Sequence, residues 1–208
     1  MIFDIVEVGP LGVNCCLLGC EETGQGIVVD PGGDVDRILI AIQKRNLTIR
    51  TIINTHGHFD HVGGNRQLKD ATAAELLIHQ ADEPMLSRVA AVAGMYGMSA
   101  QNSPAPDRFL EDGIVVEFGS HSLQVIHTPG HTPGGCCLYL VSEQLLISGD
   151  TLFADGVGRT DLPGGSHEQL VNSIRSKLFT LPDQTVVWPG HGPSTTIGHE
   201  KHHNPYLD

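Results

Sequence analysis

The segment His56-Gly57-His58-Phe59-Asp60-His61 places four side chains that can bind a metal ion within six residues. It follows the apolar run 51–53, which has the character of a buried strand, so we expect a loop at the carboxyl end of that strand. Imidazole and carboxylate together suit Zn²⁺, Fe²⁺ or Mn²⁺, and Gly57 lets the backbone bend so that alternate side chains converge. A single surface histidine is usually just solvated, but this density favours a metal site.

Three later segments share this local design, because each follows an apolar run and places one His or Asp beside Gly, where the chain can turn sharply. They are 128–134 with His131, 148–151 with Asp150, and 188–193 with His191. For either histidine loop alone, a Pro-Gly that merely ends a strand explains the pattern equally well. Taken with the first cluster, the three segments predict that these side chains join one site.

The rest of the chain mixes short strands with amphipathic helices in no strict alternation. Strands are expected near 2–8, 14–19, 26–30, 51–53, 76–79, 114–117, 123–127, 135–141, 145–148 and 185–188. Helices are expected at 34–46, 63–70, 81–96 and 167–178, and the proline-containing segment 97–107 is expected to be a surface loop or lid. This mixture predicts a layered α/β sandwich with mixed sheets.

Composition narrows the class of protein. The chain has 208 residues, 40% of them hydrophobic, so we expect a single domain over residues 1–208. A net charge of −12 disfavours binding to nucleic acid or to anionic lipid. The N-terminus lacks the features of a secretory signal, and no apolar stretch approaches the roughly 20 residues that cross a bilayer. Five cysteines without a CxxC motif fit reduced thiols in a cytoplasmic protein.

The first segment matches the HxHxDH signature of the metallo-β-lactamase superfamily in full, and the chain resembles that family in order from Asp30-Pro31-Gly32 to Asn204-Pro205-Tyr206. The resemblance implies a four-layer αββα sandwich of two mixed β-sheets, with two divalent metal ions at the upper edge of the sheets. Zinc is the first choice, with iron or manganese as alternatives. The implied ligands are His56, His58 and His131 for one ion, Asp60, His61 and His191 for the other, and Asp150 as the bridge between them.

Two ions close together lower the pKa of a bridging water, polarise a carbonyl and hold the leaving group, so no protein nucleophile is required. The catalytic candidates are therefore the two carboxylates of the ligand set, Asp60 and Asp150. Cys136 and Cys137 follow the His131 loop, but neighbours in a strand point to opposite faces, and both are expected to be core thiols.

Residues 156–165, with sequence GVGRTDLPGG, and Gly190-His191-Gly192-Pro193 resemble the glyoxalase II-like branch, especially its short bacterial members. That resemblance implies a thioesterase for a hydroxyacylglutathione such as S-lactoylglutathione, acting through metal-bound hydroxide. Arg159 is the candidate for the substrate carboxylate, and a salt bridge with Asp155 or Asp161 explains it equally well.

Two features depart from full-length glyoxalase II. The chain ends at Asp208, without that family's C-terminal helical domain, and Pro193 stands where the family usually has a tyrosine. Both features predict either a weaker specificity for glutathione or a different thiol as the carrier of the acyl group.

Several other functions fit part of the pattern. The strongest rival is a persulfide dioxygenase, which shares the fold and a Gly-Arg-Thr-Asp segment but uses one iron, here held by His56, His131 and Asp150. A nuclease is disfavoured by the lack of a basic face, and a β-lactamase by the lack of a signal peptide. A structural zinc site is normally closed by four ligands, so seven candidates argue against it.

The expected partner is a small-molecule thioester, and the oligomeric state is left open. We expect His199, His202 and His203 to lie at the surface rather than to bind metal.

Overall fold

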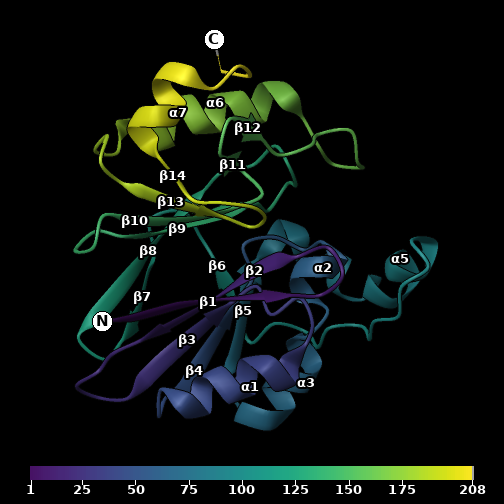
Figure 1. Cartoon of the computed structure of the whole chain (residues 1–208). Coiled ribbons are helices and arrows are strands. Elements are labelled where there is room, and N and C mark those ends of the chain that lie inside the picture. Colours follow the sequence, from purple (N-terminus) through teal and green to yellow (C-terminus); the bar gives the residue numbers. More distant parts are fainter. Residues whose placement is uncertain (208) are drawn as a thin grey trace.

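Two β-sheets lie face to face, and helices cover their outer faces (Figure 1). The computed structural model describes residues 1–207. The first sheet has the strand order β1-β2-β3-β4-β5-β6, and β1 to β3 are antiparallel whereas β3 to β6 are parallel. Its strands are β1 (Ile2–Val8), β2 (Val13–Gly19), β3 (Gln25–Val29), β4 (Thr48–Ile53), β5 (Glu75–His79) and β6 (Arg108–Leu110).

The second sheet has the order β14-β13-β10-β9-β8-β7, and its neighbours are antiparallel except for the parallel pair β10 and β13. Both sheets are therefore mixed, as predicted. Its strands are β7 (Val115–Phe118), β8 (His121–His127), β9 (Cys136–Leu140), β10 (Leu145–Gly149), β13 (Val186–Pro189) and β14 (Thr195–Thr196). A two-stranded ribbon, β11 (Leu152–Phe153) with β12 (Gly156–Val157), follows β10.

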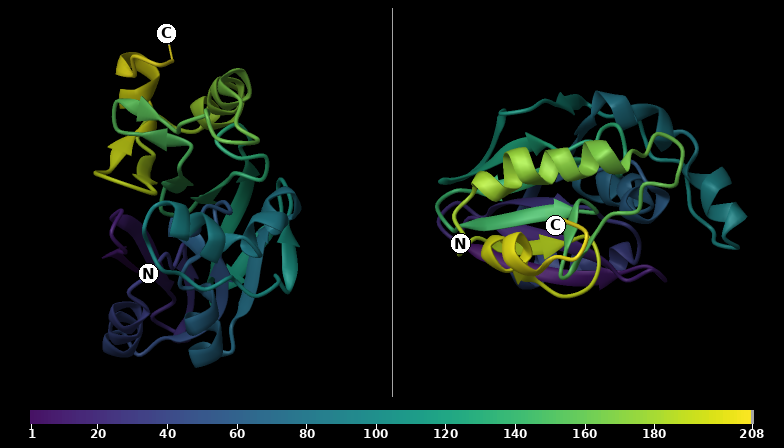
Figure 2. Two further views of the ribbon diagram at one scale, coloured as in Figure 1. Left: turned by 90° about the vertical axis from the view of Figure 1, so that its right-hand side faces the viewer. Right: turned by 90° about the horizontal axis from the view of Figure 1, so that it is seen from above.

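Helices complete the four layers (Figures 1 and 2). Helices α1 (Val35–Lys44) and α3 (Asn65–Thr72) cover the first sheet, and α6 (His167–Lys177) and α7 (Ile197–His203) cover the second. The short helices α2 (Phe59–Val62), α4 (Glu83–Leu86) and α5 (Val89–Met95) lie beside the sheets, with α5 projecting outward. The observed layer order is the predicted αββα. Within residues 1–207, no helix combines the length and apolarity that crossing a bilayer requires.

The core has one layer between the sheets and one under each pair of helices, and a smaller cluster packs among α2, α4, α5 and β5. Strand β2 is buried on both faces, because its alternate residues point into different layers. Cys16 points between the sheets, whereas Cys15 packs with Val35 and Ile38 of α1. The other adjacent cysteines divide in the same way, as predicted: Cys136 lies between the sheets and Cys137 lies toward α6.

The prediction of one helix over 81–96 was wrong. The segment is broken into the 3₁₀ turn η1 (Gln80–Asp82), α4 and α5. Pro84 occupies the first turn of α4, where a residue without a backbone N–H begins a helix rather than continuing one. The Asp82 side chain does not cap α4 and is instead buried against two other loops. The apolar spacing is therefore real, but it belongs to two separate helices.

The C-terminal segment contains a helix that the prediction lacked. Residues 197–203, for which no helix was predicted, form α7, which begins after Thr196, whose side chain accepts a hydrogen bond from the backbone N–H of His199. Strands β6, β11, β12 and β14 were also missed, because segments of two or three residues are too short to show a period. Segment 97–107 has no helix or strand, as expected for a loop.

Phe118 supplies a test of the layer between the sheets. Its side chain is 1% exposed, whereas Val115 on the same strand is 53% exposed. We expect Phe118→Ala to lower the free energy of unfolding by about 3–5 kcal/mol, because it leaves a cavity between two sheets that cannot collapse. Val115→Ala should cost less than about 1 kcal/mol. Urea unfolding of both variants checks this, and equal losses would contradict the described core.

Candidate metal centre

The predicted ligand residues all lie where strands end on one edge of the sandwich. His56 and His58 follow β4 directly, and Asp60 and His61 belong to α2, which continues from that loop. The remaining three follow strands of the second sheet: His131 comes after β8, Asp150 after β10 and His191 after β13. Each sheet therefore contributes side chains to the same place.

The structure brings together the two groups of three that the resemblance implied. In His56, His58 and His131, one nitrogen of each ring lies within 4.8 Å of the others, and the same limit holds for ligand atoms of Asp60, His61 and His191. We name these the first group and the second group. Within them, Nε2 of His56 is 3.3 Å from Nε2 of His131, and Nε2 of His61 is 3.3 Å from Nε2 of His191.

Asp150 lies between the two groups. Its Oδ2 is 3.6 Å from Nε2 of His131 in the first group and 3.7 Å from Nε2 of His191 in the second. Its Oδ1 is 3.4 Å from Nε2 of His61 but has no hydrogen-bond partner among residues 1–207. A buried carboxylate oxygen without a donor is costly unless a cation is near it.

Hydrogen bonds on the outer side of the rings fix which nitrogens face inward. Nδ1 of His131 donates to the carbonyl oxygen of Arg159 at 2.7 Å, and Nδ1 of His191 donates to that of Leu11 at 3.0 Å. Nδ1 of His61 donates to Oδ2 of Asp30 at 2.9 Å. Since these nitrogens carry the proton in the neutral ring, the inward Nε2 atoms present lone pairs.

His56 follows the same rule through Thr55. The Thr55 hydroxyl donates its one proton to Oδ2 of Asp30 at 2.6 Å, so it accepts from Nδ1 of His56 at 3.1 Å. The Nε2 lone pairs of His56 and His131 therefore face each other at 3.3 Å, an arrangement that repels unless a positive charge lies between them. Nitrogen and carboxylate donors pointing at a common centre fit a divalent metal ion in each group.

The pKa values of the first group are all depressed. Burial lowers the pKa of His56 well below its usual value, with the neighbouring histidines adding to the effect. Burial likewise lowers the pKa of His58 to about 4 and depresses that of His131. These imidazoles are therefore neutral at pH 7, which is the form that binds metal.

The second group behaves in the opposite way. Burial alone would lower the pKa of His61, but the carboxylates of Asp150 and Asp30 together raise it well above its usual value. His191 is also raised, because its hydrogen bond with Asp60 and the charge of Asp150 outweigh burial. Burial opposes ionisation of Asp60, yet the hydrogen bond from His191 and the charge of His61 keep its pKa low.

Two buried carboxylates beside the ligands were not identified as functional residues from the sequence. Asp30 accepts from the backbone N–H and hydroxyl of Thr55 at 2.8 and 2.6 Å and from His61. In the sequence, Asp30 could have been recognised as an acidic residue directly after a buried strand, β3, which runs parallel to β4. Asp82 accepts hydrogen bonds from both the His58 loop and the His131 loop. It had no signal beyond an acid inside a predicted helix.

Arg159 forms the salt bridge that was the alternative to a substrate role. Its Nε and a terminal nitrogen donate to the two oxygens of Asp161 at 2.8 and 2.7 Å. Asp155, the other proposed partner, instead lies 2.8 Å from Nε2 of His199.

His199, His202 and His203 are exposed, as expected. His199 nevertheless lies within 4.8 Å of carboxylate oxygens of Asp155 and Glu200, an arrangement that the sequence did not suggest.

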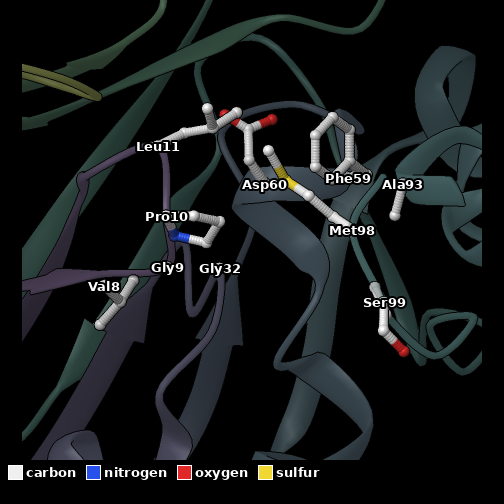
Figure 3. A pocket seen from close by; sticks show the side chains of 11 residues that line it. Val8, Gly9, Pro10, Leu11, Gly32, Phe59, Asp60, Ala93, Met98 and Ser99 are labelled. Carbon is white, nitrogen blue, oxygen red and sulfur yellow. The ribbon is translucent and has the colours of Figure 1, made fainter. Parts of the chain in front are cut away.

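Two hollows adjoin the ligand loop and share Phe59. The first, of about 220 Å³, has the Asp60 carboxylate at its edge beside Leu11, with Phe59 and Met98 next to it (Figure 3). The second is about 430 Å³ in volume, and we name it the α5 groove. It is lined by Gly57, His58, Phe59, Met85, Arg88, Val89, Val92, Met95, Tyr96, Leu162 and Pro163.

Comparison with known proteins identifies several similar chains. A family model described as the metallo-beta-lactamase superfamily matches residues 8–191. The chain is 35% identical to the hydroxyacylglutathione hydrolase GloC of Haemophilus influenzae, over 100% of this chain and 99% of that one. The crystal structure of the BLEG-1 B3 metallo-β-lactamase superposes with a TM-score of 0.92 at 35% identity, covering 99% of each chain. The di-iron-bound form of TTHA1623 gives 0.90 at 38% identity, covering 98% of this chain and 100% of that one.

The opposite pKa shifts predict different pH dependence for the two groups. The first group is neutral above pH 6.5 and should bind Zn²⁺ without releasing a proton. In the second group, the raised pKa values of His61 and His191 mean that Zn²⁺ must displace protons. Between pH 6.5 and 8.5, one dissociation constant should stay nearly constant while the other tightens by roughly tenfold per pH unit for each proton released. Chelator competition at several pH values measures both, and parallel changes would contradict the assignment.

Proposed function

The chain belongs to the metallo-β-lactamase superfamily, and from this premise we propose that it is a metal-dependent hydrolase that cleaves a thioester, namely a hydroxyacylglutathione such as S-lactoylglutathione. The observation that carries the proposal is the pair of three-residue groups joined by Asp150. The likeness to GloC supports the glutathione thioester. Two divalent ions are the proposed cofactors, and the di-iron form of TTHA1623 keeps iron beside zinc as a candidate.

When bound, two such ions lower the pKa of a water between them and polarise the thioester carbonyl. The protein's own residues prepare this chemistry. Hydrogen bonds from the outer Nδ1 atoms hold His61, His131 and His191 with Nε2 inward. Asp60 and Asp150 stay ionised, because histidines surround both carboxylates. The thiols of Cys15, Cys16, Cys136 and Cys137 are not suited to replace the water as nucleophile, since burial raises the pKa of each.

Arg159 has a place in this proposal, although it is ion-paired with Asp161. The guanidinium is more than half exposed, and exposed ion pairs contribute little free energy. A substrate carboxylate can therefore replace Asp161 at small cost. We propose that Arg159 binds a glutathione carboxylate in this way, while its backbone carbonyl holds His131.

The proposal is tested by metal analysis together with S-lactoylglutathione hydrolysis. We expect about two ions per chain, and losses of at least about 100-fold in kcat/KM for Asp60→Ala and Asp150→Ala, because each removes a carboxylate from the metal groups. Asp60→Ala should also lower the metal content toward one ion per chain. Asp70→Ala, which removes an exposed carboxylate on α3, is the matched control and should retain full activity.

Three outcomes would overturn the proposal. One iron per chain with persulfide-dependent oxygen uptake would identify a mononuclear dioxygenase. Full activity in Asp60→Ala would make the second group dispensable. Hydrolysis of a β-lactam that is faster than hydrolysis of any thioester would favour the activity that the name of BLEG-1 states.

The α5 groove predicts a preference among acyl groups. His58 lies at the groove, and apolar side chains form its walls, including the stacked pair Phe59 and Tyr96 with ring centroids 5.4 Å apart. Each methylene buried there contributes about 0.8 kcal/mol, so kcat/KM should rise about threefold to fourfold per carbon as the acyl chain of the glutathione thioester is lengthened.

Variants of α5 make this prediction specific. Val92→Asp places a charge in the groove and should abolish the gain with chain length while leaving the short substrate unaffected. Ala91→Asp, on the exposed side of the same helix, is the control. An unchanged chain-length series in Val92→Asp would exclude the groove as the acyl site.

A further inference from the structure

Asp82 is a buried carboxylate that joins two loops distant in the sequence. Its side chain is inaccessible to solvent. Oδ2 accepts from the backbone N–H of Gly57 at 3.0 Å and from the hydroxyl of Thr132 at 2.7 Å. Oδ1 accepts from the backbone N–H of Gly134 at 2.6 Å. Gly57 lies between His56 and His58, and Thr132 follows His131, so the carboxylate connects the segments that supply the first group.

The residues that form these hydrogen bonds are also closely packed. A Cβ at Gly134 would lie 2.7 Å from Cγ of Asp82, and one at Gly57 would lie 3.0 Å from the Asp82 carbonyl oxygen and 2.9 Å from Cβ of Met85. Both ligand loops therefore carry glycine where the Asp82 segment contacts them. The hydrogen bonds of Asp82 therefore fix the distance between the two loops, and the lack of a Cβ at Gly57 and Gly134 permits this close approach.

We propose that Asp82 is a positioning residue that sets the spacing of His56, His58 and His131 and thereby the metal affinity of the first group. This rests on the metal-binding part of the proposed function and on no particular reaction. The hydrogen bonds of Asp82 reach only the two loops of the first group, whereas Asp30 binds His61 of the second group directly and His56 of the first only through Thr55. Asp82 is thus the carboxylate that connects the two loops of the first group, and it forms no hydrogen bond with a residue of the second group.

Asp82→Asn changes this support with almost no change in shape. An amide has one acceptor oxygen, and its nitrogen must face either the N–H of Gly57 or the N–H of Gly134. Neither backbone donor can reverse its role, so one backbone hydrogen bond between Asp82 and a ligand loop is lost in either orientation. Glu200→Gln is the matched control, because Glu200 is also a buried carboxylate and accepts from Asp155, Thr195 and Asn204, none of which adjoins a predicted ligand.

The experiment measures Zn²⁺ affinity by chelator competition in two backgrounds. Asp60→Ala disables the second group, so the remaining ion reports the first group, and His58→Ala does the reverse. Adding Asp82→Asn should weaken Zn²⁺ binding about 10- to 100-fold in the Asp60→Ala background and less than about threefold in the His58→Ala background. Co²⁺ bound to the first group should also show a shifted absorption spectrum. Glu200→Gln should change neither affinity nor spectrum.

Each outcome separates the two proposals. Equal weakening in both backgrounds, or unchanged affinity in both, overturns the role of Asp82 while metal binding stands. Failure of the parent protein to bind Zn²⁺ or Co²⁺ overturns the proposed function instead. If Asp82→Asn does not fold, Thr132→Val removes only one of the three hydrogen bonds, and the same selective weakening, of smaller size, is expected. Its absence then overturns the role.

Discussion

The constraint on which the site depends is mutual repulsion among buried lone pairs. The Nε2 atoms of the neutral rings of His56 and His131 face each other at 3.3 Å, and one carboxylate oxygen of the neighbouring Asp150 has no donor. Without restraint, these groups would rotate to accept hydrogen bonds from water, or they would bind protons. The outer hydrogen bonds of the rings prevent this, and the chain therefore stores an unfavourable arrangement that a cation relieves.

The sandwich can hold such an arrangement in place because its two sheets contribute loops to the site from opposite sides. Strand β4 of the first sheet ends in the His56 loop, while strands β8, β10 and β13 of the second sheet end in the other ligand loops. Buried strands form a rigid base for each loop, and the carboxylates of Asp30 and Asp82 hold the loops together. Rigid strands beneath short loops are a common way to hold polar groups in place.

Sequence reasoning succeeded where the signal was local. The spacing of His56, His58, Asp60 and His61 lies within one loop, and each later candidate stands beside a glycine at a strand end, so the family pattern could be read directly. The αββα layers followed from that pattern. Asp82 was missed because its three donors come from residues 57, 132 and 134, which only the folded chain brings together.

Each metal group draws on both sheets, and this has a consequence for the order of events during synthesis. His56 and His131 are 75 residues apart, whereas His61 and His191 are 130 residues apart. The first group is complete in sequence once His131 has emerged from the ribosome, but the second awaits almost the whole chain. With the two ions proposed above, a nascent chain can bind one early, whereas the other closes a much longer loop between the first half of the chain and its end.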